Sequence, residues 1–177
     1  MASGRTLPDL GSLHLRHPGL TQAVCAYLAE AAAVCLSRHH STPIQFTLTS
    51  PVLEVEIEVS WPAPDQAMRD AHNNADDATR DGAYAVSLAA TEEWYGLRAL
   101  KRAETRTGAD YYVGLEGQDF EDALRLEVSG VDRGDDTTVN RRLRAKVEQA
   151  RRGASNLPAM AAVVGFEARL IATRAVQ

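Results

Sequence analysis

The sequence predicts an α/β fold in a single compact domain, and three observations carry this prediction. Two stretches, 44–61 and 108–130, alternate polar and apolar residues with the period of two that is typical of β-strands. Two others, 76–94 and 139–152, place their apolar residues at helical spacing. Helices and strands also follow one another along the second half of the chain, which is the order expected when helices pack on a sheet.

Length and composition describe one ordinary globular protein of 177 residues, 45% hydrophobic and 24% charged. No apolar run approaches the roughly 18 residues of a membrane span, and the first residues lack the apolar core of a secretory signal. Cys25 and Cys35 lie in a predicted helix, about 15 Å apart along its axis and beyond disulfide reach. We therefore expect reduced cysteines, a cytoplasmic location and no membrane partner.

Composition also divides the chain into three segments. Residues 1–19 are rich in glycine and proline, which predicts a flexible lead-in. Residues 20–62 are expected to form an N-terminal helix and a β-hairpin. Pro62-Ala63-Pro64 marks the boundary, and residues 65–177 are expected to form the core.

The second segment opens with a helix from Leu20 to Arg38, for which Thr21 is the expected N-cap. The hairpin Ile44–Trp61 has one apolar face and one acidic face, the latter carrying Glu54, Glu56 and Glu58. Such a face is typical of solvent exposure, and acidic side chains on strands discourage edge-to-edge aggregation. A docking face for a protein partner is the alternative.

The third segment begins with a long helical stretch, Asp65 to Tyr95, with a break expected near His72–Asn74. Further along, the apolar patterns predict a strand at Leu97–Leu100, a helix at Val139–Arg152, and strands at Met160–Phe166 and Arg169–Thr173.

The stretch 108–130 reads as an antiparallel hairpin whose loop spans Leu115 to Asp122. Asp110 lies at the mouth of its first strand. In the second strand Glu127 and Ser129 share a face, opposite the Leu and Val side chains. The hairpin can thus bring the Asp110 and Glu127 carboxylates together, as a hard cation such as Mg²⁺ requires. Two solvated acids on an edge hairpin are the alternative.

Charge is distributed unevenly along the chain. The formal net charge of −5 excludes a protein whose whole surface binds nucleic acid. Residues 133–152, however, hold seven basic residues against three acids. On the helix 139–152 one flank carries Arg142, Lys146 and Gln149. These side chains either enter a cleft at the rim of the sheet, where phosphate can bind, or form a solvated helix face.

From Ala75 onward the expected order is helix, three strands, helix, strand, with Asp110, Glu127 and Gln149 on successive elements. This pattern resembles the core of the restriction-endonuclease-like (PD-(D/E)XK) nuclease superfamily. It is also similar to uncharacterised bacterial proteins of that type, which carry a Gly-x-Asp strand, a Leu-Glu-Val-Ser-Gly strand and an Arg-x-x-x-Lys-x-x-Gln helix. The resemblance implies a restriction-endonuclease-like core to which the first segments add a helix and a hairpin.

The resemblance also implies a metal site. Asp110 and Glu127 would hold Mg²⁺ or Mn²⁺ with the help of the Val128 carbonyl. Asp81 would correspond to the acid often found on the first core helix.

In the superfamily a lysine follows two residues after the strand glutamate, whereas this chain has Ser129 there. Lys146 would replace that lysine from the neighbouring helix. Gln149 would complete the catalytic set, and Arg142 and Ser129 would contact the substrate. Without a charged replacement, the barrier would rise by several kcal/mol, or on the order of 10²–10³ in rate.

Two functions follow from the resemblance. The first is a divergent metal-dependent nuclease acting on nucleic-acid phosphodiesters, as a subunit of a bacterial defence system, with nucleic acid bound along the helix 139–152. The second is a catalytically inactive nuclease-fold protein that serves as an interaction or scaffold subunit. A protein partner or a homo-oligomer is expected in either case.

Overall fold

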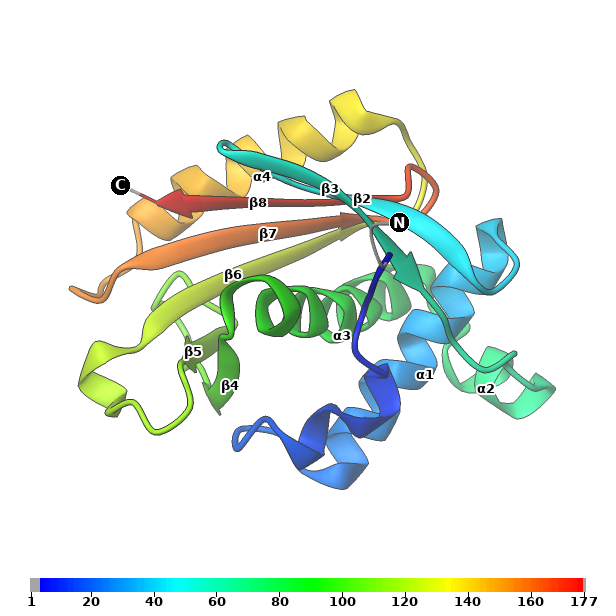
Figure 1. The fold of residues 1–177 in the computed structure, drawn as a ribbon, viewed down its shortest axis with the longest axis horizontal. Helices are drawn as coiled ribbons and strands as arrows, with labels where there is room; N and C mark the ends of the chain where they lie inside the picture. Colours follow the sequence, from blue (N-terminus) through cyan, green and yellow to red (C-terminus); the bar gives the residue numbers. More distant parts are fainter. Residues whose placement is uncertain (1–3, 177) are drawn as a thin grey trace.

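Eight strands form one sheet in the computed structural model, which describes residues 4–176 (Figure 1). The strands are β1 (Arg5–Thr6), β2 (Ile44–Ser50), β3 (Leu53–Val59), β4 (Arg98–Arg102), β5 (Tyr111–Gly114), β6 (Leu124–Val131), β7 (Ala159–Gly165) and β8 (Leu170–Val176). Their order across the sheet is β1-β3-β2-β8-β7-β6-β5-β4. The N-terminal hairpin is therefore part of the same sheet as the C-terminal strands.

Four α-helices and two short 3₁₀-helices accompany this sheet over the described range. They are η1 (Leu10–Leu15), α1 (Gln22–His39), α2 (Gln66–Ala71), α3 (Ala75–Tyr95), η2 (Phe120–Asp122) and α4 (Asp136–Arg151). The predicted break in the long helical stretch is confirmed, because α2 ends at Ala71 and Asn74 caps α3. Thr21 caps α1 as predicted, with its hydroxyl accepting from the Val24 N–H at 3.2 Å. The mixed α/β class is thus confirmed.

Strand pairing confirms both predicted hairpins. β2 pairs with β3 and β5 pairs with β6, each antiparallel. β6 and β7 are parallel, with α4 as the connection between them, and β7 returns antiparallel into β8. The last strand is longer than the predicted Arg169–Thr173, because it pairs with β7 along its whole length.

The two faces of the sheet have separate cores. The larger core lies between the sheet and α1 and α3, and it takes Leu126 and Val128 from β6. The smaller core lies under α4. α4 contributes the predicted apolar stripe, which consists of Val139, Leu143, Val147 and Ala150. Since side chains alternate along a strand, Glu127 and Ser129 face the α4 side.

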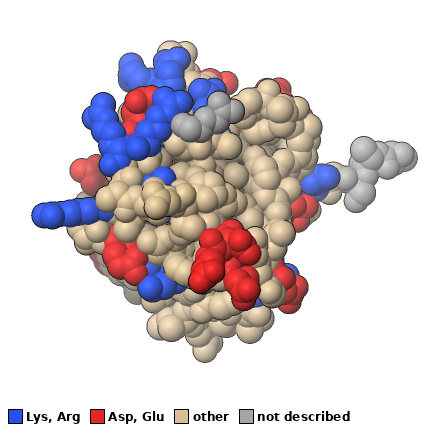
Figure 2. Space-filling model, turned by 90° about the vertical axis from the view of Figure 1, so that its left-hand side faces the viewer, with Lys and Arg blue, Asp and Glu red and all other residues tan. Residues whose placement is uncertain are grey.

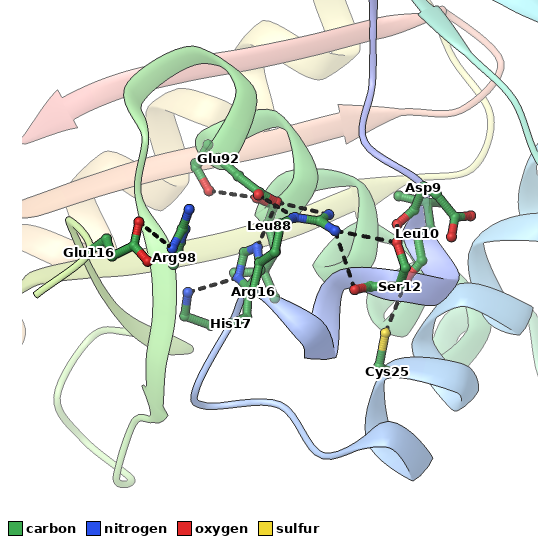
Figure 3. A network of polar contacts seen from close by, with 12 residues as sticks. Asp9, Leu10, Ser12, Arg16, His17, Cys25, Leu88, Glu92, Arg98 and Glu116 are labelled. Carbon is green, nitrogen blue, oxygen red and sulfur yellow. Dashed lines mark hydrogen bonds and ion pairs between the residues drawn. The ribbon is translucent and has the colours of Figure 1, made fainter.

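The flexible lead-in expected over residues 1–19 is not what residues 4–19 show; residues 1–3 lie outside the described range. η1 is ordered by burial of Leu10 and Leu13 against α1 and α3. His17 is fully buried, and its Nδ1 accepts from the Ala99 N–H at 2.8 Å. Its Nε2 therefore carries the proton and donates to Glu92 at 2.9 Å (Figure 3). Contacts with residues far along the chain hold this segment in place, and composition does not reveal them.

Cys25 and Cys35 are both buried and free, as expected. Among the residues described, none of the helices is both long enough and apolar enough to cross a bilayer. The cytoplasmic location stays a prediction.

Candidate functional site

The candidate site lies along the part of β6 that has no paired strand on one side. β5 pairs only with Leu124–Leu126. Beyond that point, residues 127–130 keep β7 on one side and face a cleft of about 810 Å³ on the other. Residues of α3, of α4 and of the β4–β5 loop complete the cleft walls. A strand edge that is open in the middle of a domain exposes backbone groups as well as side chains.

Asp110 lies at this edge, just before β5, and hydrogen bonds of both its backbone and its carboxylate hold it in place. Its backbone N–H donates to the Leu126 carbonyl at 2.7 Å. Its Oδ2 accepts from the Val128 N–H, and its Oδ1 accepts from the Tyr84 hydroxyl, both at 2.7 Å. Because the N–H and C=O of a strand residue point to the same side, the Val128 carbonyl also faces the open edge.

Glu127 is the second carboxylate of the cleft, and its side chain is only 4% exposed. Its Oε1 accepts from Lys146 Nζ at 2.7 Å. Burial raises the pKa of Glu127, the nearby Asp110 carboxylate raises it further, and Lys146 offsets these effects only in part. Two acids that repel each other in a confined place favour the arrival of a cation.

α4 brings its predicted flank into the cleft. Lys146 Nζ also donates to Gln149 Oε1 at 3.0 Å. Arg142 and Ser129 line the same cleft, Arg142 from α4 and Ser129 from β6. Six of the seven side chains predicted for the site thus meet here, namely Asp110, Glu127, Ser129, Arg142, Lys146 and Gln149.

Asp81 is the exception. It is buried beside α1, where it accepts from the Tyr27 hydroxyl at 3.0 Å and from Arg80 Nε at 2.9 Å, and it does not line the cleft. Helix phase explains this placement. α3 turns Asp76, Arg80 and Tyr84 toward the cleft at intervals of four residues, and Asp81 lies about 100° away from that row.

The residues that do meet include the types of ligand that a divalent cation takes in proteins. Within residues 4–176, no three His, Cys, Asp or Glu side chains gather closely enough to hold a metal ion alone. Mg²⁺, however, is often bound by one or two carboxylates and keeps several waters. Asp110, Glu127 and the Val128 carbonyl offer two charged ligands and one neutral oxygen ligand on one edge.

Two further residues of the site, Tyr84 and Arg102, were not predicted, because neither belongs to a recognisable sequence motif. The Arg102 guanidinium lies 4.5 Å from the ring centroid of Tyr84 and 4.8 Å from that of Tyr111. It donates to the Tyr84 hydroxyl at 3.1 Å and lies 3.8 Å from Asp110. Burial raises the pKa of Tyr84 to about 12, so this hydroxyl stays protonated and remains a donor to Asp110.

The cleft is basic on balance although the chain is acidic. Its lining has six basic side chains, Arg80, Arg102, Arg106, Arg142, Lys146 and Arg152, and four acidic ones, Asp76, Glu104, Asp110 and Glu127. Figure 2 looks at the end of the molecule where α4 finishes in Figure 1, and it shows Lys and Arg side chains gathered at the upper left. A polyanion is therefore a suitable ligand for this cleft.

Comparison of the chain with protein-family models, with curated protein sequences and with solved structures found no match.

Proposed function

We propose that the protein is a divergent nuclease that uses Mg²⁺ or Mn²⁺ to hydrolyse nucleic-acid phosphodiesters at the open edge of β6. The observation that carries the proposal is the meeting of three charged groups from three elements: Asp110, Glu127 and Lys146. The order α3, β4, β5, β6, α4, β7 supports it further, because this is the order implied by the resemblance to restriction-endonuclease-like nucleases.

Asp110 and Glu127 would hold the cation, with the Val128 carbonyl as a neutral ligand. The bound cation would supply an activated water and charge stabilisation at the phosphate. The chain's own part is orientation. Tyr84 and the Val128 N–H each hold one oxygen of Asp110, so its carboxylate is fixed before any ligand arrives.

Lys146 would take over the role of the lysine that Ser129 replaces. Its ammonium is already beside Glu127, and Ser129 is a small neutral neighbour on the same face of β6. With substrate in place, the ammonium would stabilise the negative charge that develops on the phosphate oxygens. A donor of this kind accounts for about 10²–10³ in rate.

The direct test is cleavage of mixed DNA and RNA, single- and double-stranded, in Mg²⁺, in Mn²⁺ and in EDTA. We expect metal-dependent cutting that disappears in Glu127→Gln and falls about 10²–10³-fold in Lys146→Ala. Glu121→Gln, an exposed acid on η2, is the matched control and should cut like the wild type. Cutting that survives Glu127→Gln would point to a contaminant.

The second candidate is an inactive nuclease-fold protein that serves as an interaction subunit. Two observations favour it: Ser129 in place of the lysine, and the edge of β3, which β1 covers only at Ile57 and Glu58. Val52, at the turn that leads into β3, is 91% exposed. Absence of cutting by the folded protein on every substrate would favour this candidate over the nuclease.

A further inference from the structure

We propose that Arg106, Arg142 and Arg152 form a phosphate track, which binds the backbone of a nucleic-acid strand beside Asp110 and Glu127 without reading its bases. The proposal rests on the proposed function for the identity of the polymer, but it concerns binding and not cleavage. Only Arg142 was expected from the sequence; Arg106 lies in the β4–β5 loop, and Arg152 is the C-cap of α4.

The three track arginines differ from the other basic groups of the cleft in having no acidic partner. In the part of the chain that the structure describes, the ion pairs of the cleft use the remaining cations, namely Arg80 with Asp77 and Asp81, Arg102 with Asp110, and Lys146 with Glu127. Arg106, Arg142 and Arg152 are exposed and take part in none of them. Their charge is therefore available to an external anion.

Close backbone packing brings Arg106 and Arg152 together. A Cβ added to Gly108 would lie 2.9 Å from the Cα of Gly153, and Gly108 has a φ of +65°. A Cβ added to Gly153 would lie 2.2 Å from the Thr107 carbonyl oxygen. The β4–β5 loop and the end of α4 thus touch backbone to backbone, and only glycine permits this approach.

Arg125 also stabilises this contact between the β4–β5 loop and the end of α4. Only 5% of this residue is exposed, and its guanidinium donates to the carbonyls of Thr107 at 2.7 Å, Leu157 at 3.0 Å and Ala150 at 3.1 Å. These carbonyls belong to the β4–β5 loop, the segment before β7 and the last turn of α4. A cation at a helix C-terminus is also favoured by the helix dipole. Arg125 therefore holds the β4–β5 loop and the end of α4 against each other.

The lining of the cleft explains why bases would not be read. Tyr84 is the only aromatic residue among the described residues that line it, and Tyr84 is buried beneath Arg102. Stacking on unpaired bases uses exposed aromatic rings, which the described lining lacks, so its unpaired arginines are suited to phosphate contacts. Arg142 and Arg152 are ten residues apart on α4, or about 15 Å along its axis, so the track spans more than one phosphate.

The test is equilibrium binding of labelled 20-nucleotide strands and duplexes in EDTA, by fluorescence anisotropy over a range of KCl concentrations. Two double variants remove the same charge: Arg106→Ala with Arg152→Ala in the track, and Arg144→Ala with Arg174→Ala as the control. Arg144 and Arg174 line a separate hollow beside α4. We expect the track variant to lower the slope of log K against log salt by about 1.4 to 1.8 and the control to change it much less. Lysine at both track positions should restore most of the slope.

Several outcomes would overturn the track. Two of them concern the slope of log K against log salt: an equal decrease in both double variants, or no decrease in the track variant. The other two are no binding by the folded wild type at low salt, and affinities that differ more than about tenfold between base sequences. Different results would refute the nuclease proposal and the track. Arginine-dependent binding without cleavage would refute the nuclease and leave the track, whereas cleavage with unchanged binding in the track variant would refute only the track.

Discussion

Two clusters of buried acids and bases contact α3, and they differ in how completely their charges are satisfied. Glu92 is paired with both Arg16 and His17 (Figure 3). Burial alone would raise the pKa of Glu92, but the hydrogen bonds from Arg16 and His17 outweigh it and the pKa is lowered. Glu127 has one cation, Lys146, and a second carboxylate nearby, and its pKa is raised.

This difference indicates which cluster stabilises the fold and which is suited to a ligand. The Glu92 cluster joins the N-terminal segment to α3 and to β4, and every charged group in it has a partner. The Glu127 cluster brings two carboxylates into one open cleft, where the charge of Asp110 raises the pKa of Glu127. Perturbed acids in a cleft mark functional sites more often than closed pairs do.

The largest expected effect is a difference in stability between substitutions of the two glutamates. Glu92→Gln should lower the free energy of unfolding by about 3 kcal/mol, because it leaves the buried His17 and the partly buried Arg16 without their anion. Glu127→Gln should change it by less than about 1 kcal/mol, because repulsion with Asp110 is relieved. Urea unfolding of both variants measures this. Equal losses would remove the distinction between the clusters.

The next effect is the dependence of stability on pH. Burial lowers the pKa of His17, so the unfolded chain takes up a proton first and stability falls as the pH drops below about 6.5. The raised pKa of Glu127 acts in the opposite sense, because the folded state takes up the proton first as the pH falls toward its unfolded value. Each group contributes at most about 1.4 kcal/mol per pH unit.

The two contributions can be separated by substitution. His17→Gln should remove the loss of stability on acidification, whereas Glu127→Gln should make that loss steeper. His14→Gln, at a neighbouring histidine on η1, is the control for a His→Gln change that leaves His17 in place. Urea titrations between about pH 5 and pH 7 measure all three. An unchanged profile in His17→Gln would show that its burial is not what sets the acid limit.

A smaller effect is expected from Mg²⁺. A cation that binds only the folded protein stabilises it by about 1 kcal/mol at five times its dissociation constant. We expect this gain in the wild type and in Glu92→Gln, and its loss in Glu127→Gln and Asp110→Asn. Calorimetric titration gives the affinity directly. No gain in the wild type, at millimolar Mg²⁺, would contradict the carboxylate pair as a cation site.

Local patterns in the sequence predicted much of the Glu127 cluster. Period-two alternation placed Asp110 and Glu127 on one hairpin, and helical spacing placed Lys146 beside Gln149. These signals depend on neighbours along the chain. Whether the carboxylates lie at an open edge depends on the short pairing of β5 with β6, which no local pattern reveals.

The parts that the sequence did not predict depend on distant contacts. His17 finds its partner at Ala99, 82 residues away, so the N-terminal segment looked unstructured. Asp81 lay on the predicted helix, but the face of that helix that meets the cleft is set by packing on the sheet. Arg125 interrupts an apolar strand like any solvated residue, although it is buried against three carbonyls.

The smallest effect separates two tyrosines of α3 whose hydroxyls each form a hydrogen bond with another side chain. The Tyr84 hydroxyl binds Asp110, and the Tyr95 hydroxyl lies 2.9 Å from the Thr173 hydroxyl, outside the cleft. Each Tyr→Phe substitution should cost about 1 kcal/mol of stability or less. Only Tyr84→Phe should lower the affinity for Mg²⁺, by about threefold, because it removes the hydroxyl that donates to Asp110 and accepts from Arg102 while keeping the ring beneath Arg102. Equal Mg²⁺ affinities in the two variants would mean that the Val128 N–H alone orients Asp110, and that Tyr84 contributes to the fold as Tyr95 does.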